Sequence, residues 1–150
     1  MQATKYSPEV QAFIDDMIPR QIAADRALHN GDASLRHETY SRNSPLTVLG
    51  AFGVIADGWE EMTKTWDWVA SRYSDVKQFD FELIAAGVSQ SGDLAYTVGY
   101  ERSLLSRDGG ELIEHVVRAT HVYRHEDGVW KICHRQGDNL PAGHAPGLGQ

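Results

Sequence analysis

The chain has little of several features that would place it in well-defined classes. Its 150 residues include one cysteine, Cys133, which excludes an internal disulfide and fits a reducing compartment. No stretch reaches the roughly 18 apolar residues that a membrane helix needs, and the first residues lack the apolar core of a secretion signal. Lys and Arg number 14 against 21 Asp and Glu, and the net charge of −7 argues against nucleic acid or an anionic membrane as partners. We therefore expect a soluble, cytoplasmic protein with an uncharged or small-molecule partner.

Motifs for cofactors and metals are also missing. The sequence contains no glycine-rich phosphate loop, no nucleophile elbow and no Cys-x-x-Cys pair. His121 and His125 are four residues apart, but along a strand this separation is about 13 Å, too far for chelation. We expect no cofactor and no metal.

The N-terminal part has the pattern of helices. Ser7-Pro8-Glu9 is typical of a helix start, with a capping serine and a proline in the first turn. Apolar residues then recur every three or four positions, and Pro19 is predicted to break or kink this helix. A second helical stripe ends at Asn30-Gly31, and Asp32 is placed to cap a short third helix.

The later part of the chain has the pattern of a sheet. The apolar run 46–56 is β-like, and residues 59–73 form an amphipathic helix with Trp59 and Trp66 on its inner face. Strand candidates follow over residues 77–88 and 94–105 and in a hairpin over 111–138, all joined by short Gly/Asp turns. Helices followed by an antiparallel meander predict an α+β fold. We expect one domain over residues 1–140 and a flexible Pro/Gly-rich tail over 141–150.

Several segments resemble a known family. They are SPLTVLGAFG (44–53), GW (58–59), SGDLAYTVGYE (91–101) and RATHVYRHEDGVWKICHRQGD (118–138). They resemble the SnoaL-like and ketosteroid isomerase-like branch of the nuclear transport factor two-like superfamily, and are also similar to the association domain of calmodulin-dependent protein kinase. The resemblance implies a cone-shaped, curved antiparallel sheet wrapped around helices, a pocket at the wide end of the cone, and a dimer through the outer sheet face.

The register of the last hairpin decides which side chains line that pocket. A three-residue loop at 126–128 would pair His125 with Val129 and gather one set of side chains on one face. A tighter turn would shift the register by one residue and separate Arg118 from His134. We expect the longer loop, because it gathers the polar positions that the resemblance places in the pocket. The set is Arg118, Thr120, Val122, Ile132, His134, Gln136 and Asp138.

The preceding strand supplies a carboxylate to the same interior. Ala95, Thr97, Gly99 and Glu101 alternate with larger residues and are expected to point inward. An inward Glu101 needs a partner, and Arg118 is the candidate, within about 4 Å, because a guanidinium can bind a carboxylate through two hydrogen bonds. Such a pair is more often structural than catalytic.

The predicted site combines titratable and ligand-binding groups. His134 is either a general acid or base or a hydrogen-bonded core histidine, and Asp138 is either a base, as the resemblance to polyketide cyclases suggests, or a strand-end group in solvent. The predicted ligand-binding residues are Glu101, Arg118, Thr120, Gln136, Trp59, Trp66 and Thr97. Both tryptophans are core residues first and ligand-stacking walls second.

Three functions remain open from the sequence. The first is a small-molecule-binding domain with its pocket inside the cone. The second is a cofactor-independent isomerase, cyclase or dehydratase that uses general acid/base catalysis on a small apolar substrate. The third is a structural dimerisation module. Binding is placed ahead of catalysis because the acid/base set is incomplete. A homodimer is expected through an outer face of Tyr96, Val98, Tyr100, Val117, His121 and Tyr123, too apolar for an exposed sheet.

Overall fold

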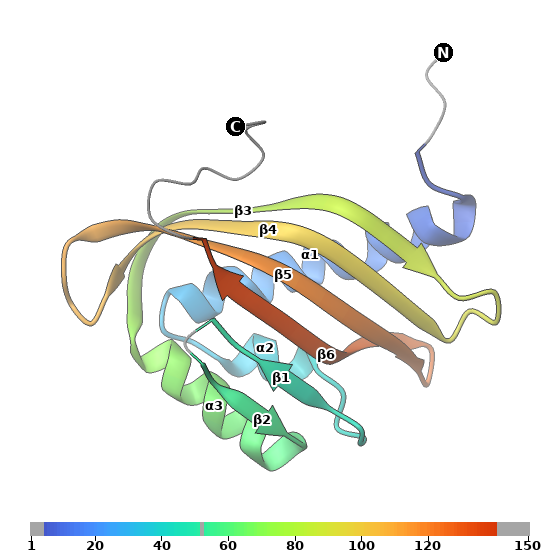
Figure 1. Ribbon diagram of the computed structural model, residues 1–150, viewed down its shortest axis with the longest axis horizontal. Helices are drawn as coiled ribbons and strands as arrows, with labels where there is room; N and C mark the ends of the chain where they lie inside the picture. The colour runs from blue at the N-terminus through green and yellow to red at the C-terminus, as the bar shows by residue number, and fades with distance from the viewer. Residues whose placement is uncertain (1–4, 52, 141–150) are drawn as a thin grey trace.

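A computed structural model describes residues 5–51 and 53–140 of the chain (Figure 1). The helices are α1 (Pro8–His29), α2 (Ser34–Thr39) and α3 (Trp59–Ser71). The strands are β1 (Thr47–Leu49), β2 (Ile55–Asp57), β3 (Tyr73–Val88), β4 (Leu94–Arg107), β5 (Leu112–Glu126) and β6 (Val129–Asn139). This order of elements confirms the α+β class. The tail predicted for residues 141–150 lies outside the described residues.

The six strands form one curved sheet in the order β2-β1-β6-β5-β4-β3. Every neighbouring pair is antiparallel except β1 and β6, so the sheet is mixed rather than antiparallel throughout. No hairpin joins β1 to β6, because β2, α3 and three strands separate them in the chain, and their direction is therefore free of a turn constraint. Figure 1 shows α1 running behind the long strands, with α2 and α3 below it. None of the helices in the described part of the chain is long and apolar enough to cross a membrane.

Helix α1 is continuous over 22 residues, so the predicted break at Pro19 is wrong. The start is as expected, since Ser7 caps the helix by accepting a hydrogen bond from the backbone N–H of Val10 at 3.3 Å. Pro19 and Asp15 both lie on the exposed side of the helix. Water can therefore bind the Asp15 carbonyl that the missing proline N–H leaves free, which makes the proline tolerable. One long helix replaces the two predicted ones, and α2 follows as the short third.

Close approach of β3 and β4 depends on Gly99. A Cβ built at this position would lie 2.6 Å from the Glu82 carbonyl oxygen and 2.6 Å from the Phe81 ring. A larger residue would force the two strands apart. The small residues predicted to face the interior of β4 therefore do allow the sheet to curve closely.

The β5–β6 hairpin differs from its predicted register in two places. Asp127 and Gly128 both have positive φ, 50° and 79°, and form a two-residue turn in which Glu126 pairs with Val129. The expected three-residue loop is therefore wrong. A bulge then lies beside Cys133, where the pairing changes from Tyr123↔Ile132 to Val122↔His134.

The two shifts together explain which side chains share a face. Near the turn the register is displaced by one residue from the prediction, and beyond the bulge by two. A displacement of two restores the original grouping, since side chains alternate with a period of two. Arg118, Thr120, His134, Gln136 and Asp138 do share a face, as predicted, but it is the outer one, and Ile132 faces inward.

The residues that lie on the outer face also differ from those predicted. Tyr96, Val98 and Tyr100 lie on it as expected, whereas Val117, His121 and Tyr123 are buried on the inner face. The pairing of Glu101 with Val117 explains this, because directly opposed residues point to the same side of a sheet. Leu94 and Tyr96 are 45% and 46% exposed, so the face keeps an apolar patch.

The homodimer through this face stays a prediction. We expect light scattering at micromolar concentration to give twice the chain mass, because a dimer would cover the apolar patch around Tyr96. Tyr96→Arg should shift the mass to that of the monomer, since it places a charge in the middle of the contact. A wild-type protein that is monomeric under these conditions would contradict the prediction.

Candidate functional site

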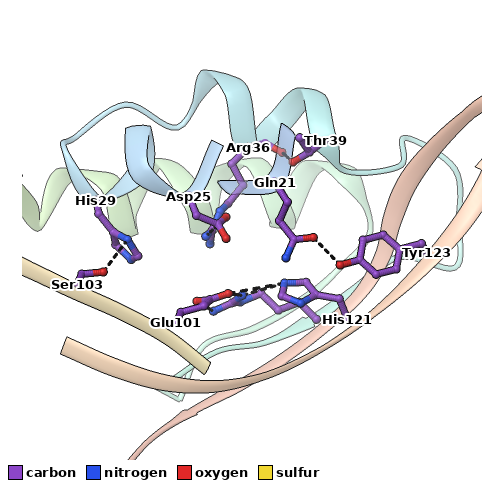
Figure 2. A network of polar contacts seen from close by, with 10 residues as sticks. Gln21, Asp25, His29, Arg36, Thr39, Glu101, Ser103, His121 and Tyr123 are labelled. Atoms are coloured by element: carbon purple, nitrogen blue, oxygen red, sulfur yellow. Dashed lines mark hydrogen bonds and ion pairs between the residues drawn. The ribbon is translucent and has the colours of Figure 1, made fainter. Parts of the chain in front are cut away.

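The interior between α1 and the sheet is lined by polar side chains to an extent that a purely structural core does not require. Figure 2 shows side chains of α1 and α2 pointing toward side chains of β4 and β5. Those buried from the helices are Gln21, Asp25, His29, Arg36 and Thr39, and those from the strands are Thr97, Glu101, Ser103, His115, His121 and Arg135. Buried polar groups are stable only when paired, so the partners of each group decide what this interior can do.

The carboxylate of Glu101 points inward as predicted, but its partner is Arg135. The guanidinium of Arg135 donates two parallel hydrogen bonds to Glu101, of 2.6 Å from Nη1 to Oε2 and 2.8 Å from Nη2 to Oε1. Both side chains are almost completely buried. Burial alone would raise the pKa of Glu101, but the charge and hydrogen bonds of Arg135 outweigh it and hold the pKa well below its usual range. Glu101 is therefore ionised in the folded protein.

His121 is held neutral beside this pair. A guanidinium can only donate, so the 2.9 Å contact from Arg135 Nη1 makes Nε2 of His121 the acceptor and leaves the proton on Nδ1. Burial and the charge of Arg135 lower the pKa of His121 to about 3. The ring is therefore an uncharged support for Arg135.

A second ion pair joins α1 to α2. Arg36 Nη2 lies 2.5 Å from Asp25 Oδ1, and the Arg36 guanidinium stacks on Trp66 with 4.4 Å between Cζ and the ring centroid. Burial raises the pKa of Asp25 to about 6, since the opposing charge of Arg36 is itself partly offset by Glu101. Asp25 is thus the buried carboxylate whose protonation lies nearest to neutral pH in this group.

Two further histidines lie toward the C-terminal end of α1. Nδ1 of His29 is 3.2 Å from the hydroxyl of Ser103, and Nε2 of His115 is 3.3 Å from the hydroxyl of Tyr73. Burial lowers the pKa of His115 to about 4 and lowers that of His29 well below its usual value. Both rings are neutral in the folded protein.

A small cavity of about 30 Å³ lies between these groups. Its polar wall includes Arg36, Trp66, Glu101 and Arg135, and its apolar wall includes Val69 and Val117. Three of the residues that line it carry a buried N–H group with no hydrogen-bond partner among the described residues: Nε of Arg36, Nε of Arg135 and Nε1 of Trp66. All three are donors. An unpaired buried donor costs roughly 1–3 kcal/mol, so three at one cavity call for an acceptor from outside the chain.

The other predicted site residues lie away from this cavity. Arg118 forms a bidentate pair with Asp138 on the outer face, at 2.9 Å and 2.6 Å, with both side chains more than half exposed. The predicted contact between Arg118 and Glu101 is therefore wrong. His134 lies on the same outer face, where Nδ1 is 2.8 Å from the hydroxyl of Thr47.

Four of the predicted polar residues line a shallow hollow on the outer face. It has a volume of about 320 Å³ and includes Arg118, Thr120, Gln136 and Asp138 in its lining. The predicted polar set is thus brought together as expected, but outside the cone instead of inside it.

The remaining predicted residues divide between interior and edge. Thr97 faces inward, where its hydroxyl is 2.9 Å from that of Tyr123. Trp66 lines the cavity, as its predicted ligand-wall role requires. Trp59 is half-buried and packs under Arg42, with 4.4 Å between Cζ and the ring centroid, away from the cavity.

Sequence reasoning missed Arg135, Arg36 and Asp25. Simple alternation along β6 from Ile132 places His134 and Gln136 inward, and only the bulge beside Cys133 turns Arg135 into the interior. Arg36 and Asp25 occupy positions on the buried side of their helices. For Asp25 the available signal was its helical spacing from the apolar Ile18 and Leu28, whereas α2 buries only Arg36 and Thr39 and has no apolar stripe to mark Arg36.

The buried pair gives a direct test of the corrected geometry. Arg135→Leu should lower the free energy of unfolding by roughly 3–5 kcal/mol in urea denaturation, because it leaves Glu101 as an unpaired buried charge. Adding Glu101→Leu should recover much of this loss. Arg118→Leu is the matched control and should change stability little, since its pair is exposed to water. Equal stabilities of the Arg135→Leu single variant and the double variant would show that the two residues are not coupled.

The neutral histidines predict how stability depends on pH. Their pKa values are depressed in the folded state, so the stability they contribute is present above the unfolded value of 6.5 and is lost as the pH falls. Asp25 acts in the opposite direction, because its raised pKa makes the folded state take up a proton as the pH falls toward about 6.

Near pH 5 the unfolded chain binds about three more protons on these histidines than the folded protein does, and the folded protein binds about one more on Asp25. The unfolded chain therefore binds about two more protons in total. The free energy of unfolding should therefore fall by roughly 2–3 kcal/mol per pH unit there, at about 1.4 kcal/mol per proton. Urea denaturation at a series of pH values measures this slope. A stability that is constant or rises as the medium is acidified between neutrality and pH 5 would contradict the assignment of neutral rings.

Comparison with known proteins agrees with this architecture. A family model described as the SnoaL-like domain matches residues 26–138. No curated protein matches the sequence. Among solved structures, a ketosteroid isomerase-like protein from Erwinia carotovora superposes with a TM-score of 0.71 at 16% identity, covering 91% of this chain and 99% of that one.

Two further structures extend the likeness. A nuclear transport factor 2-like superfamily protein from Salmonella enterica has a TM-score of 0.65 at 17% identity, covering 93% of this chain and 96% of its own. A protein with a cystatin-like fold from Caulobacter vibrioides has a TM-score of 0.63 at 17% identity, covering 84% and 89%. These identities establish a shared fold, and the family match covers most of the chain. The chain therefore belongs to the SnoaL-like domain family.

Proposed function

We propose that this protein binds a small organic molecule in the cavity inside the cone, through an acceptor oxygen of the ligand. The observation that carries the proposal is the set of three unpaired donors on one wall, Nε of Arg36, Nε of Arg135 and Nε1 of Trp66. Each belongs to a residue that is at most 5% exposed, so bulk water does not satisfy it. An oxygen with two lone pairs, or two oxygens on one carbon, is the group that such a wall recognises.

The volume of the cavity limits what enters it. About 30 Å³ is the volume that one water molecule occupies in the liquid, so the cavity as it stands admits a single acceptor oxygen, and the rest of a ligand enters only if the lining moves apart. Gly50, Ala51 and Val54 form part of the same lining. Because these residues are small and apolar, the part of the ligand that contacts them is expected to be apolar as well. A short carbonyl or carboxyl compound with an apolar tail fits this description.

Binding is favoured over the alternative in which His134 and Asp138 act as catalytic residues. The catalytic alternative needed both residues inside the cone, whereas they lie on the outer face, where His134 contacts Thr47 and Asp138 contacts Arg118.

The indole of Trp66 provides the test. In proton–nitrogen NMR spectra, adding acetone, acetamide or acetate should shift the Trp66 Nε1–H signal in a saturable way, because this donor gains an acceptor. Trp66→Phe keeps the aromatic surface under Arg36 and removes the donor, and should weaken the affinity, measured for this variant from backbone amide signals, about five- to tenfold. Trp68→Phe, on the exposed side of the same helix, is the control and should leave affinity unchanged. If none of the three probes shifts the Trp66 signal in a folded protein, the proposal is wrong.

A further inference from the structure

The charges around the cavity are balanced before a ligand enters. The cations Arg36 and Arg135 face the anions Asp25 and Glu101, and all four residues are at most 5% exposed. Since three unpaired donors line the wall, an oxyanion suits it better than a neutral oxygen, because hydrogen bonds to an ionised acceptor are about twice as strong. However, an added anion would leave one uncompensated negative charge in a low-dielectric interior, which is strongly unfavourable. One of the buried carboxylates must then be neutralised.

The geometry distinguishes the two carboxylates. Glu101 receives two hydrogen bonds from Arg135, one on each oxygen. Asp25 receives one bond, on Oδ1 from Arg36, and its Oδ2 is buried without a partner among the described residues. A proton on Oδ2 therefore meets no existing hydrogen bond, whereas both oxygens of Glu101 already accept a charged hydrogen bond from Arg135 that protonation would weaken. Asp25 is the group on which neutralisation is least costly.

Asp25 also controls the guanidinium that the ligand would contact. Arg36 binds Asp25 through Nη2, keeps an unpaired Nε, and is itself one of the residues that line the cavity. When Asp25 is neutral, the charge of Arg36 is no longer compensated locally, and an anion on the other side of the guanidinium can take the place of the carboxylate. We propose that the cavity takes a small carboxylate together with one proton, which goes to Asp25, so that Arg36 exchanges its charge partner from Asp25 to the ligand. This inference rests on the binding function proposed above.

The groups around Asp25 are compatible with this proton uptake. Arg36 from α2 and Arg135 from β6 favour its ionised form, whereas burial and Glu101 from β4 oppose it. Tyr40 after α2 and Tyr123 from β5 also face it, and burial keeps the pKa of both phenols above the usual range, so they stay neutral. The pKa of Asp25 is about 6, while the pKa of His121 is about 3 and that of His115 about 4. Near neutral pH, Asp25 is therefore the group of this interior that can take the proton.

Calorimetry on the wild-type protein tests the proton directly. Acetate and acetamide are the probes, since they share size and shape and differ in charge. At about pH 7.5, titrations in two buffers of different ionisation enthalpy should show uptake of close to one proton per acetate bound and none per acetamide. The apparent dissociation constant for acetate should rise about tenfold between about pH 6.5 and about pH 7.5, because each binding event needs a proton that becomes scarcer. The constant for acetamide should not change over this range.

Variants identify the residue that takes the proton. Asp25→Asn is neutral at every pH and should bind acetate with the same affinity at both pH values, more tightly than the wild type at the higher one. Arg36→Gln should weaken acetate binding at least tenfold more than it weakens acetamide binding. Arg102→Gln, which alters an ion pair with Glu82 on the outer face, is the matched control and should behave as the wild type.

The outcomes separate this inference from the function on which it rests. Acetate binding without proton uptake, or acetamide binding as tight as that of acetate at about pH 6.5, overturns the inference and leaves the binding function standing. Failure of all probes to bind overturns both. Should Asp25→Asn fail to fold, the proton count on the wild-type protein still decides the question.

Discussion

Two buried guanidinium–carboxylate pairs set the character of this protein's interior. Arg135 bridges from β6 across β5 to Glu101 on β4, and Arg36 joins α2 to Asp25 on α1. Each ion would be prohibitively costly in this environment without its partner, so one pair favours a single relative position of β4 and β6 within the sheet and the other a single relative position of α1 and α2. The neutral state of His121 and the stacking on Trp66 follow from where these two guanidinium groups lie.

The two pairs differ in how completely they are satisfied, and this difference separates structure from function. Glu101 and Arg135 match each other with two hydrogen bonds and hold three strands in register. Asp25 and Arg36 share one hydrogen bond and each keeps an unpaired polar atom. A fully matched pair has little reason to change state, whereas a partly matched pair can exchange its partner for a ligand or a proton. The cavity is lined by Glu101 and Arg135 of the first pair and by Arg36 of the second.

The bulge beside Cys133 is the local feature through which this arrangement forms. One extra residue in β6 reverses the alternation, so Trp130 and Ile132 face inward before it and Arg135 and Gly137 after it. Without the bulge, His134 would occupy the interior and Glu101 would have no cation within reach on that strand. The same feature sends Gln136 and Asp138 to the outer face, where Asp138 pairs with Arg118.

The sequence by itself determined the α+β class, the positions of most elements, the inward direction of Glu101 and Thr97, and the family. These depend on local patterns: capping residues, the spacing of apolar residues, and glycines at turns. Only the tertiary structure decided the partner of Glu101 and the faces of β5 and β6. Both depend on registers between strands. The Asp127-Gly128 dipeptide does mark a two-residue turn, but the bulge beside Cys133 has no evident mark in the sequence. On β5 the register against β4 places Val117 opposite Glu101, so Arg118, one residue further along, points to the opposite face.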